Sequence, residues 1–270
     1  MISVQQAISR FRRDTTLSTV LKTALAFCLA AVLMLHFIPL GKTLDPTFLL
    51  IALGIIWMML WHYTAKGSRL AAESSSLIAS GRLDQAEAQI EQSLKAFSMS
   101  RSVKSMSLLN LALVRLAQKR WPDTALLCRE VLSTPKNTPE HLSKSGRLML
   151  ADSLLEMGDL RGAHEALSGL YQHRLTLSEA LNLLRVQTDY LSRIGAWPQL
   201  FEGVSTKIAL AEIMPTPNAA RVQAMLALAA KKTGKPQWSD WLKRRVELLV
   251  DVRDLATERP ALWELWEKQA

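Results

Sequence analysis

The composition of the chain excludes several classes of protein. Of its 270 residues, 49% are hydrophobic and only 6% aromatic, which disfavours an all-β fold. Two cysteines, Cys28 and Cys128, are too few for a disulfide scaffold or a four-cysteine metal site, and we interpret both as inert, buried thiols. The net charge of +9 is compatible with anionic lipid nearby but is too diffuse to indicate nucleic acid.

Two apolar segments near the N-terminus predict transmembrane helices at 23–41 and 46–65. They hold nineteen and twenty residues without a charged side chain, and a span needs about 20 because the hydrocarbon core is about 30 Å thick. The second segment ends in rings that are typical of the membrane interface, namely Trp57, Trp61, His62 and Tyr63. A pair of buried core helices is the first alternative. A cleavable signal peptide is the second.

The charges around these segments predict a topology. Basic residues dominate the segment 1–22 and follow the second span, whereas the connection between the spans holds Lys42 as its one basic residue. The positive-inside rule therefore places both ends of the chain in the cytoplasm. We expect a protein of the bacterial inner membrane, with a mitochondrial-type membrane as the alternative. Apolar and basic side chains mixed over 2–13 predict a short helix on the membrane surface.

From residue 67 to about 250, helical periodicity is interrupted by evenly spaced turn signals. The turns begin at Gly81, Lys119, Gly158, Gly195 and Gly234, at intervals of 38, 39, 37 and 39 residues. Each turn is followed by a bulky apolar residue, and a glycine there suits a left-handed helix end. This spacing predicts an all-α repeat domain of about five helix pairs, 67–250.

The third of these units has the most complete pattern of small and apolar residues: Ala151, Leu154, Gly158, Leu160, Ala163 and Leu167. It resembles the tetratricopeptide repeat family, in which small residues let two helices pack closely. The first two units fit as well, whereas the fourth and fifth fit mainly by spacing. The units are longer than the 34 residues usual for the family. An irregular helical bundle is the alternative.

The segment 251–270 predicts a C-terminal capping helix. Its apolar residues are Leu262, Trp263, Leu265 and Trp266. A partner-binding aromatic motif is the alternative interpretation.

No motif in the sequence indicates catalysis. There is no HExxH pair, phosphate-binding loop, GxGxxG or GxSxG pattern. Asp152 and Glu156 form the closest carboxylate pair, and we interpret them as surface residues because no histidine or other metal ligand is near. We therefore expect no enzyme, no metal and no cofactor.

The resemblance implies a groove that binds a protein or peptide, lined by the first helix of each pair. When the fourth unit is aligned by its turn glycine, Gly195, the residues that face the groove are Asn182, Arg185, Asp189, Arg193 and, from the fifth unit, Arg221. This face is polar and net basic, which suits an acidic peptide or a C-terminal carboxylate. The second unit instead presents an apolar run, which we expect a neighbouring helix or the membrane-proximal linker to bury: Met106, Leu109, Leu113 and Leu116.

The sequence thus favours a non-enzymatic interaction scaffold, held by two transmembrane helices and carrying a cytoplasmic repeat domain. The second hypothesis is an assembly or quality-control factor for membrane or envelope proteins, whose spans themselves contact a client. Nucleic-acid binding is not expected, because basic and aromatic residues do not interleave on one predicted face.

Overall fold

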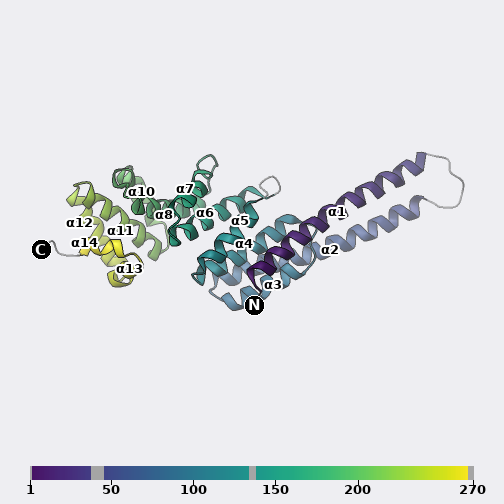
Figure 1. Ribbon diagram of the computed structural model, residues 1–270, viewed down its shortest axis with the longest axis horizontal. Helices are drawn as coiled ribbons and strands as arrows, with labels where there is room; N and C mark the ends of the chain where they lie inside the picture. Colours follow the sequence, from purple (N-terminus) through teal and green to yellow (C-terminus); the bar gives the residue numbers. More distant parts are fainter. Residues whose placement is uncertain (1, 38–45, 134–137, 267–270) are drawn as a thin grey trace. The chain divides into compact units, whose positions relative to one another are not determined.

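A computed structural model describes residues 2–37, 46–133 and 138–266, and every element in these ranges is a helix (Figure 1). The all-α prediction is confirmed. Contacts divide the chain into two compact units, Met1–Met149 and Leu150–Ala270.

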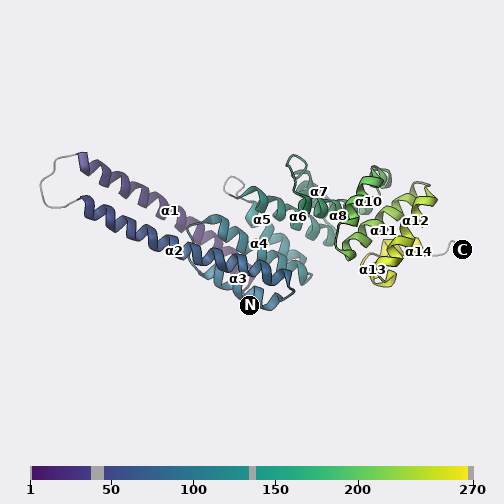
Figure 2. The same cartoon turned by 180° about the vertical axis from the view of Figure 1, so that it is seen from behind.

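The first unit begins with two long helices that run side by side (Figures 1 and 2), α1 (Val4–Phe37) and α2 (Pro46–Ala79). Both are long and apolar enough to cross a membrane, over Val4–Met34 and Phe48–Ala79. Only 11% and 0% of their apolar windows are buried, which argues against the alternative of two core helices. Large apolar side chains such as Phe27, Phe48 and Met58 are exposed instead.

Helix α2 does not end where its apolar segment ends. It continues through Lys66 to Ala79 and packs against α3 (Leu83–Lys95) as the first helix of the first pair. Gly67, within α2, is buried beside the Val103 side chain. The predicted boundary near residue 66 is therefore a point inside one helix and not a linker, because no proline or cap interrupts the backbone hydrogen bonds there.

The N-terminal turns of α1 pack inside the first unit. Ile2 and Phe11 are 2% and 1% exposed, and α1 contacts α3, α4 and α5 as well as α2. Arg12 donates two hydrogen bonds, of 2.7 and 2.6 Å, to the Glu130 carboxylate of α5. The expectation of a helix lying on the membrane surface at 2–13 is therefore wrong, since its largest apolar side chain is covered by protein.

Two buried ion pairs strengthen this packing. The guanidinium of Arg115 donates to both carboxylate oxygens of Glu87, at 3.0 and 2.8 Å, and to the Ile2 carbonyl at 3.2 Å. The Lys104 ammonium pairs with Asp14 at 2.7 Å and donates to the Leu94 carbonyl at the end of α3. Burial lowers the pKa of Lys104, and the hydrogen bond and charge of Asp14 oppose that change. Together the pairs join α1, α3 and α4.

Five helix pairs follow one another along the chain, the first being α2 and α3. The others are α4 (Arg101–Ala117) with α5 (Trp121–Leu132), α6 (Glu140–Glu156) with α7 (Leu160–Ser168), α8 (Leu177–Arg193) with α9 (Trp197–Phe201) and α10 (Val204–Glu212), and α11 (Thr216–Lys232) with α12 (Pro236–Leu249). The second helix of the fourth pair is divided at Gly203, which has a φ of 63°.

All five predicted turns have the same backbone conformation. The first residue of each lies in the left-handed region, with φ of 76° at Gly81, 57° at Lys119, 79° at Gly158, 68° at Gly195 and 71° at Gly234. The next amide donates to the carbonyl five residues back, as Asp159 does to Leu154 at 2.9 Å. This is the Schellman helix end, and it satisfies carbonyls that the preceding helix leaves free.

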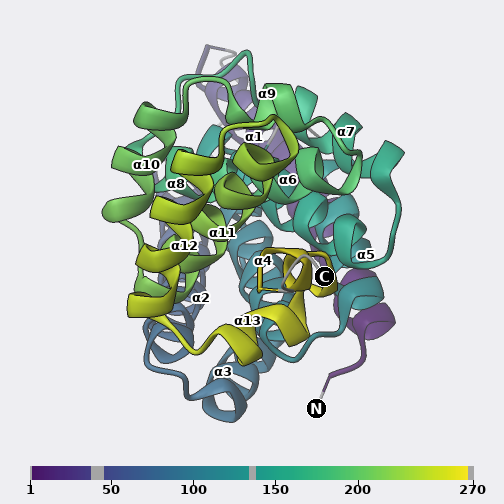
Figure 3. The ribbon, with the colours of Figure 1, turned by 90° about the vertical axis from the view of Figure 1, so that its left-hand side faces the viewer.

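In the second unit, α11 is buried nearly all round and is built from small residues. Ala219, Ala220, Ala224, Ala227 and Ala229 are each at most 4% exposed. Figure 3 shows α11 between α12 and the C-terminal elements, and most of the α11 side chains that its neighbours cover are apolar. Alanine at these positions lets several helices approach it closely.

The segment after α12 is not the single helix that the sequence predicts. It forms α13 (Val252–Glu258), a 3₁₀ turn (Pro260–Leu262) and α14 (Trp263–Trp266). Pro260 lacks an amide hydrogen, so α13 cannot continue through it. Leu255, Leu262 and Leu265 are buried in the core cluster that surrounds α11.

Candidate partner-binding site

Four of the five predicted groove residues meet in one cluster of ion pairs in the second unit. Arg185, Asp189 and Arg193 extend from α8 and Arg221 from α11. Asn182, also on α8, is exposed and stands outside the cluster.

Asp189 is the centre of this cluster, and its side chain is 2% exposed. Its Oδ2 accepts hydrogen bonds from Arg221 at 2.7 Å, from Arg259 at 3.2 Å and from Arg193 at 3.4 Å. Arg259 lies between α13 and the 3₁₀ turn, so the C-terminal segment places a charged group against α8. Three arginines on one carboxylate oxygen form a network that no single pair could replace.

Two further carboxylates of α6 complete the cluster. Glu156 accepts from Arg193 at 3.1 Å and also pairs with Arg259. Asp152 receives two hydrogen bonds from Arg185, of 3.2 and 2.8 Å, in the parallel geometry that suits guanidinium and carboxylate. The described part of the cluster therefore holds four arginines and three carboxylates, with one positive charge in surplus.

Electrostatics explains why these groups remain charged. Burial alone would raise the pKa of Asp189, but the charges of Arg221, Arg259 and Arg193 outweigh it and lower that pKa below its ordinary value. Burial also lowers the pKa of Arg221, although Asp189 opposes it. The side chain of Arg193 is the most accessible of the four guanidinium groups, at 26% exposed.

Sequence reasoning missed three members of this cluster. The interpretation of Asp152 and Glu156 as surface residues is wrong, because their side chains are 10% and 17% exposed and paired with arginines. The positions of the two carboxylates relative to the turn glycines could have identified them. Asp152 and Asp189 each lie six residues before a turn glycine, and Glu156 and Arg193 each lie two before. Arg259 had no comparable signal, since it lies outside the repeats.

The apolar run of the second helix pair, which lies on α4, is partly covered. Leu109 is 3% exposed and lies beside Gly146 of α6. The other members, Met106, Leu113 and Leu116, are half-buried. Helix α6 therefore covers part of this run, in line with the expectation from the sequence.

Part of the repeat domain matches the model of a known family. Residues 72–140 match the model of the tetratricopeptide repeat, from the end of α2 to the start of α6. The predicted resemblance is thereby confirmed over the first two helix pairs. Tetratricopeptide repeats are helical modules for protein–protein interaction and are typically non-catalytic. No curated protein and no solved structure matches the chain.

Proposed function

We propose that this chain is a membrane-anchored, non-enzymatic scaffold that binds proteins on the cytoplasmic side of a bacterial inner membrane. The observation that carries the proposal is the continuity of α2. Its exposed apolar half is long enough to span a bilayer, and its other half is the first helix of a domain that matches the tetratricopeptide repeat. A partner bound to the repeats is then held at the membrane surface.

The packing of the N-terminus supports the proposed topology. Arg12 bonds to Glu130 of α5, and Arg115 of α4 bonds to the carbonyl of Ile2. The start of α1 and the repeats must therefore occupy the same side of the membrane. The excess of Lys and Arg on that side favours the cytoplasm.

The partner that the second unit suits best is an acidic segment or a C-terminal carboxylate. The cluster has one positive charge in surplus, and Arg193 is its most accessible arginine. A partner carboxylate reaching Arg193 would compete with Glu156, which Arg259 still holds. The exchange would leave every carboxylate of the cluster with an arginine partner.

Site-specific photocrosslinking of the full chain in cells tests this function. A photoreactive residue at Asn182, which is exposed beside the cluster, should capture a protein partner. The matched control is the same residue at Arg161 of α7, whose side chain is 91% exposed and lies outside the cluster. Arg193→Glu should abolish the capture from position 182. Equal capture from both positions, or capture that survives Arg193→Glu, contradicts a site at the cluster.

A second function, direct contact between the spans and membrane-protein clients, is favoured by the exposure of large side chains on both spans. Phe27 is 76% and Phe48 71% exposed. Exchange of residues 24–33 and 48–55 for unrelated apolar sequence tests it while leaving the buried N-terminal turns in place. If capture at position 182 survives and membrane proteins still copurify with the exchanged chain, the spans only hold the chain in the membrane. If those membrane proteins are lost while capture at position 182 persists, the spans contact the client.

A further inference from the structure

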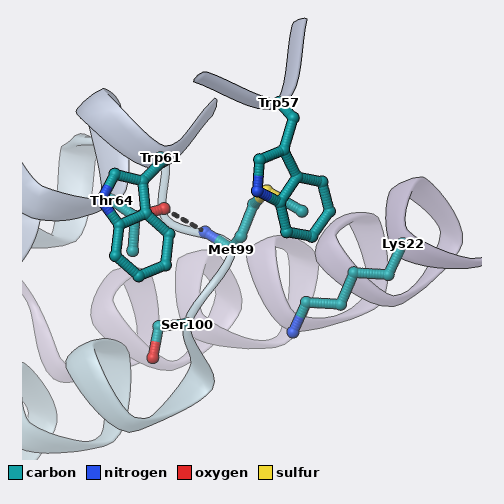
Figure 4. Close-up of a pocket in the computed structure, with 6 residues that line it drawn as sticks. All are labelled: Lys22, Trp57, Trp61, Thr64, Met99 and Ser100. Atoms are coloured by element: carbon teal, nitrogen blue, oxygen red, sulfur yellow. Dashed lines mark hydrogen bonds between the residues drawn. The ribbon is translucent and has the colours of Figure 1, made fainter. Parts of the chain in front are cut away.

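A pocket in the first unit lies where the apolar surface of the two long helices ends. Figure 4 shows its lining, which comes from α1, α2 and the loop before α4: Lys22, Trp57, Trp61, Thr64, Met99 and Ser100. Its volume is 180 Å³. The Met99 amide donates to the Thr64 hydroxyl at 3.0 Å and so holds the loop against α2. The pocket is therefore part of the packed structure of the first unit.

The two tryptophans are exposed although they are large. Trp57 and Trp61 lie one turn apart on α2 and are 52% and 68% exposed. An indole combines an apolar ring with one N–H donor, and such rings concentrate at the boundary between lipid tails and headgroups. Exposed apolar side chains, including Ile51 and Ile55, occupy the preceding turns of α2. The two rings therefore mark the level at which a bilayer would end.

Lys22 supplies a positive charge at the same level. It is exposed and has no ion pair among the residues that the structure describes. Arg13 and Lys104, by contrast, both lie near enough to Asp14 to pair with it. In Figure 4 the Lys22 side chain extends below the Trp57 ring towards the interior of the pocket. An ammonium group in this position attracts an anion.

We propose that this pocket binds the phosphate-bearing headgroup of an anionic phospholipid, taken from the leaflet next to the repeats. Lys22 pairs with the phosphate. The Ser100 hydroxyl, which shares a hydrogen bond of 2.7 Å with the Ser102 hydroxyl, can donate to the phosphate when Ser102 supplies the proton of that bond. Trp57 and Trp61 pack on the glycerol and the first methylene groups. Lys66 and Arg69, both exposed on the next turns of α2, add to the attraction for an anionic lipid over a zwitterionic one. The inference rests on the proposed insertion of α1 and α2 in a membrane.

The test is native mass spectrometry of the full chain, released from nanodiscs of phosphatidylcholine with or without phosphatidylglycerol. We expect wild-type protein to retain phosphatidylglycerol and not phosphatidylcholine. One surface lysine contributes about fivefold to the attraction for an anionic membrane. Lys22→Gln should therefore lower retention by more than about fivefold, and Lys66→Gln, the matched control outside the pocket, by no more than that.

Each outcome bears on the proposal. Equal losses of phosphatidylglycerol retention in the two variants would indicate only diffuse attraction to the surface and would overturn the proposed site in the pocket. Equal retention of phosphatidylglycerol and phosphatidylcholine by the wild-type protein would overturn it too. Loss of the bound lipid on adding millimolar inorganic phosphate would point to a free-phosphate site instead of a lipid site. Trp57→Leu should lower retention without changing the thermal unfolding midpoint. Extraction of the chain from membranes by alkaline carbonate would refute insertion itself, whereas failed lipid retention by an inserted chain refutes only this inference.

Discussion

At the scale of single residues, a buried ion pair joins α4 to α3 in the first unit. The Arg115 and Glu87 side chains are 2% and 3% exposed, and their charges are satisfied only by each other and a few neighbours. A buried pair of this kind adds little net stability relative to apolar residues of equal size, but removal of one partner is costly because the other stays buried and charged.

Arg115→Met should therefore destabilise the protein by about 3–5 kcal/mol, since Glu87 would lose both hydrogen bonds from the guanidinium. The measurement is the thermal unfolding midpoint of the full chain in detergent micelles. The double variant Arg115→Met with Glu87→Leu should recover most of the loss. Arg161→Met removes an exposed arginine and should leave the midpoint unchanged. An Arg115 variant as stable as that control would contradict the argument.

The carboxylates of both units predict a loss of stability in acid. The hydrogen bond from Arg115 lowers the pKa of Glu87 although burial opposes it, and the surrounding arginines lower that of Asp189 against the same opposition. A lowered pKa means that the unfolded chain binds more protons as the pH falls below about 4, the ordinary value of these groups. Their contribution is therefore complete above that pH and is lost below it.

Asp189→Asn isolates one of these contributions. At pH 7 the variant should unfold at a lower temperature than wild type, because Arg221, Arg259 and Arg193 lose their shared charge partner. The difference between the two proteins should shrink as the pH falls below about 4, where Asp189 takes up a proton in the unfolded wild-type chain before it does so in the folded one. Unfolding midpoints at several pH values measure it. A difference independent of pH would show that Asp189 acts by packing and not by charge.

At the scale of elements, the five helix ends are the most regular feature of the chain. Four have glycine in the left-handed position and one has Lys119, the one residue other than glycine with a positive φ in the described ranges. A side chain in this conformation costs about 1–2 kcal/mol, because the β-carbon approaches a carbonyl oxygen. Lysine does not favour the left-handed conformation. The turn at Lys119 therefore forms because the packing of the helices on both sides requires it.

Opposite substitutions at two of these turns should change stability in opposite directions. Gly158→Ala should destabilise by about 1 kcal/mol, and Lys119→Gly should stabilise by up to about 1 kcal/mol. A β-carbon at Gly158 would meet no atom within 4 Å, so its effect isolates the backbone conformation. Both are measured by thermal unfolding. Changes of the same sign would refute the backbone explanation.

At the scale of the whole molecule, the two cysteines distinguish a membrane-inserted chain from a soluble one. Cys128 is buried, and burial raises its pKa to about 12, so it should stay unreactive in the folded protein. Cys28 is exposed, which corrects the expectation of two buried thiols. It lies within the apolar part of α1, so a bilayer would cover it.

A membrane-impermeant maleimide should accordingly label neither cysteine in intact membranes, and both after denaturation in detergent. The single variants Cys28→Ala and Cys128→Ala assign each label. Rapid labelling of Cys28 in intact membranes would show that water reaches it, which excludes the proposed insertion. Labelling of Cys128 before denaturation would show that the first unit opens locally.

The helical repeats and the two candidate spans could be recognised from the sequence alone. Helical periodicity, five evenly spaced turns and two uncharged segments specify an all-α repeat with two candidate spans, because these signals are local: a glycine sets a backbone conformation and an apolar run sets a helix length. The register of those turns was also enough to bring Arg185, Asp189, Arg193 and Arg221 to one place.

The contacts that those residues make depend on the tertiary structure. Arg259 reaches Asp189 from a position seventy residues along the chain, and Arg115 holds the carbonyl of Ile2 across 113 residues. Likewise, only packing shows that the start of α1 is buried in the first unit and that α2 passes from its apolar segment into the repeats without a break. Contacts between distant segments depend on how helices stack, and neither periodicity nor local turn chemistry encodes which side chains then meet.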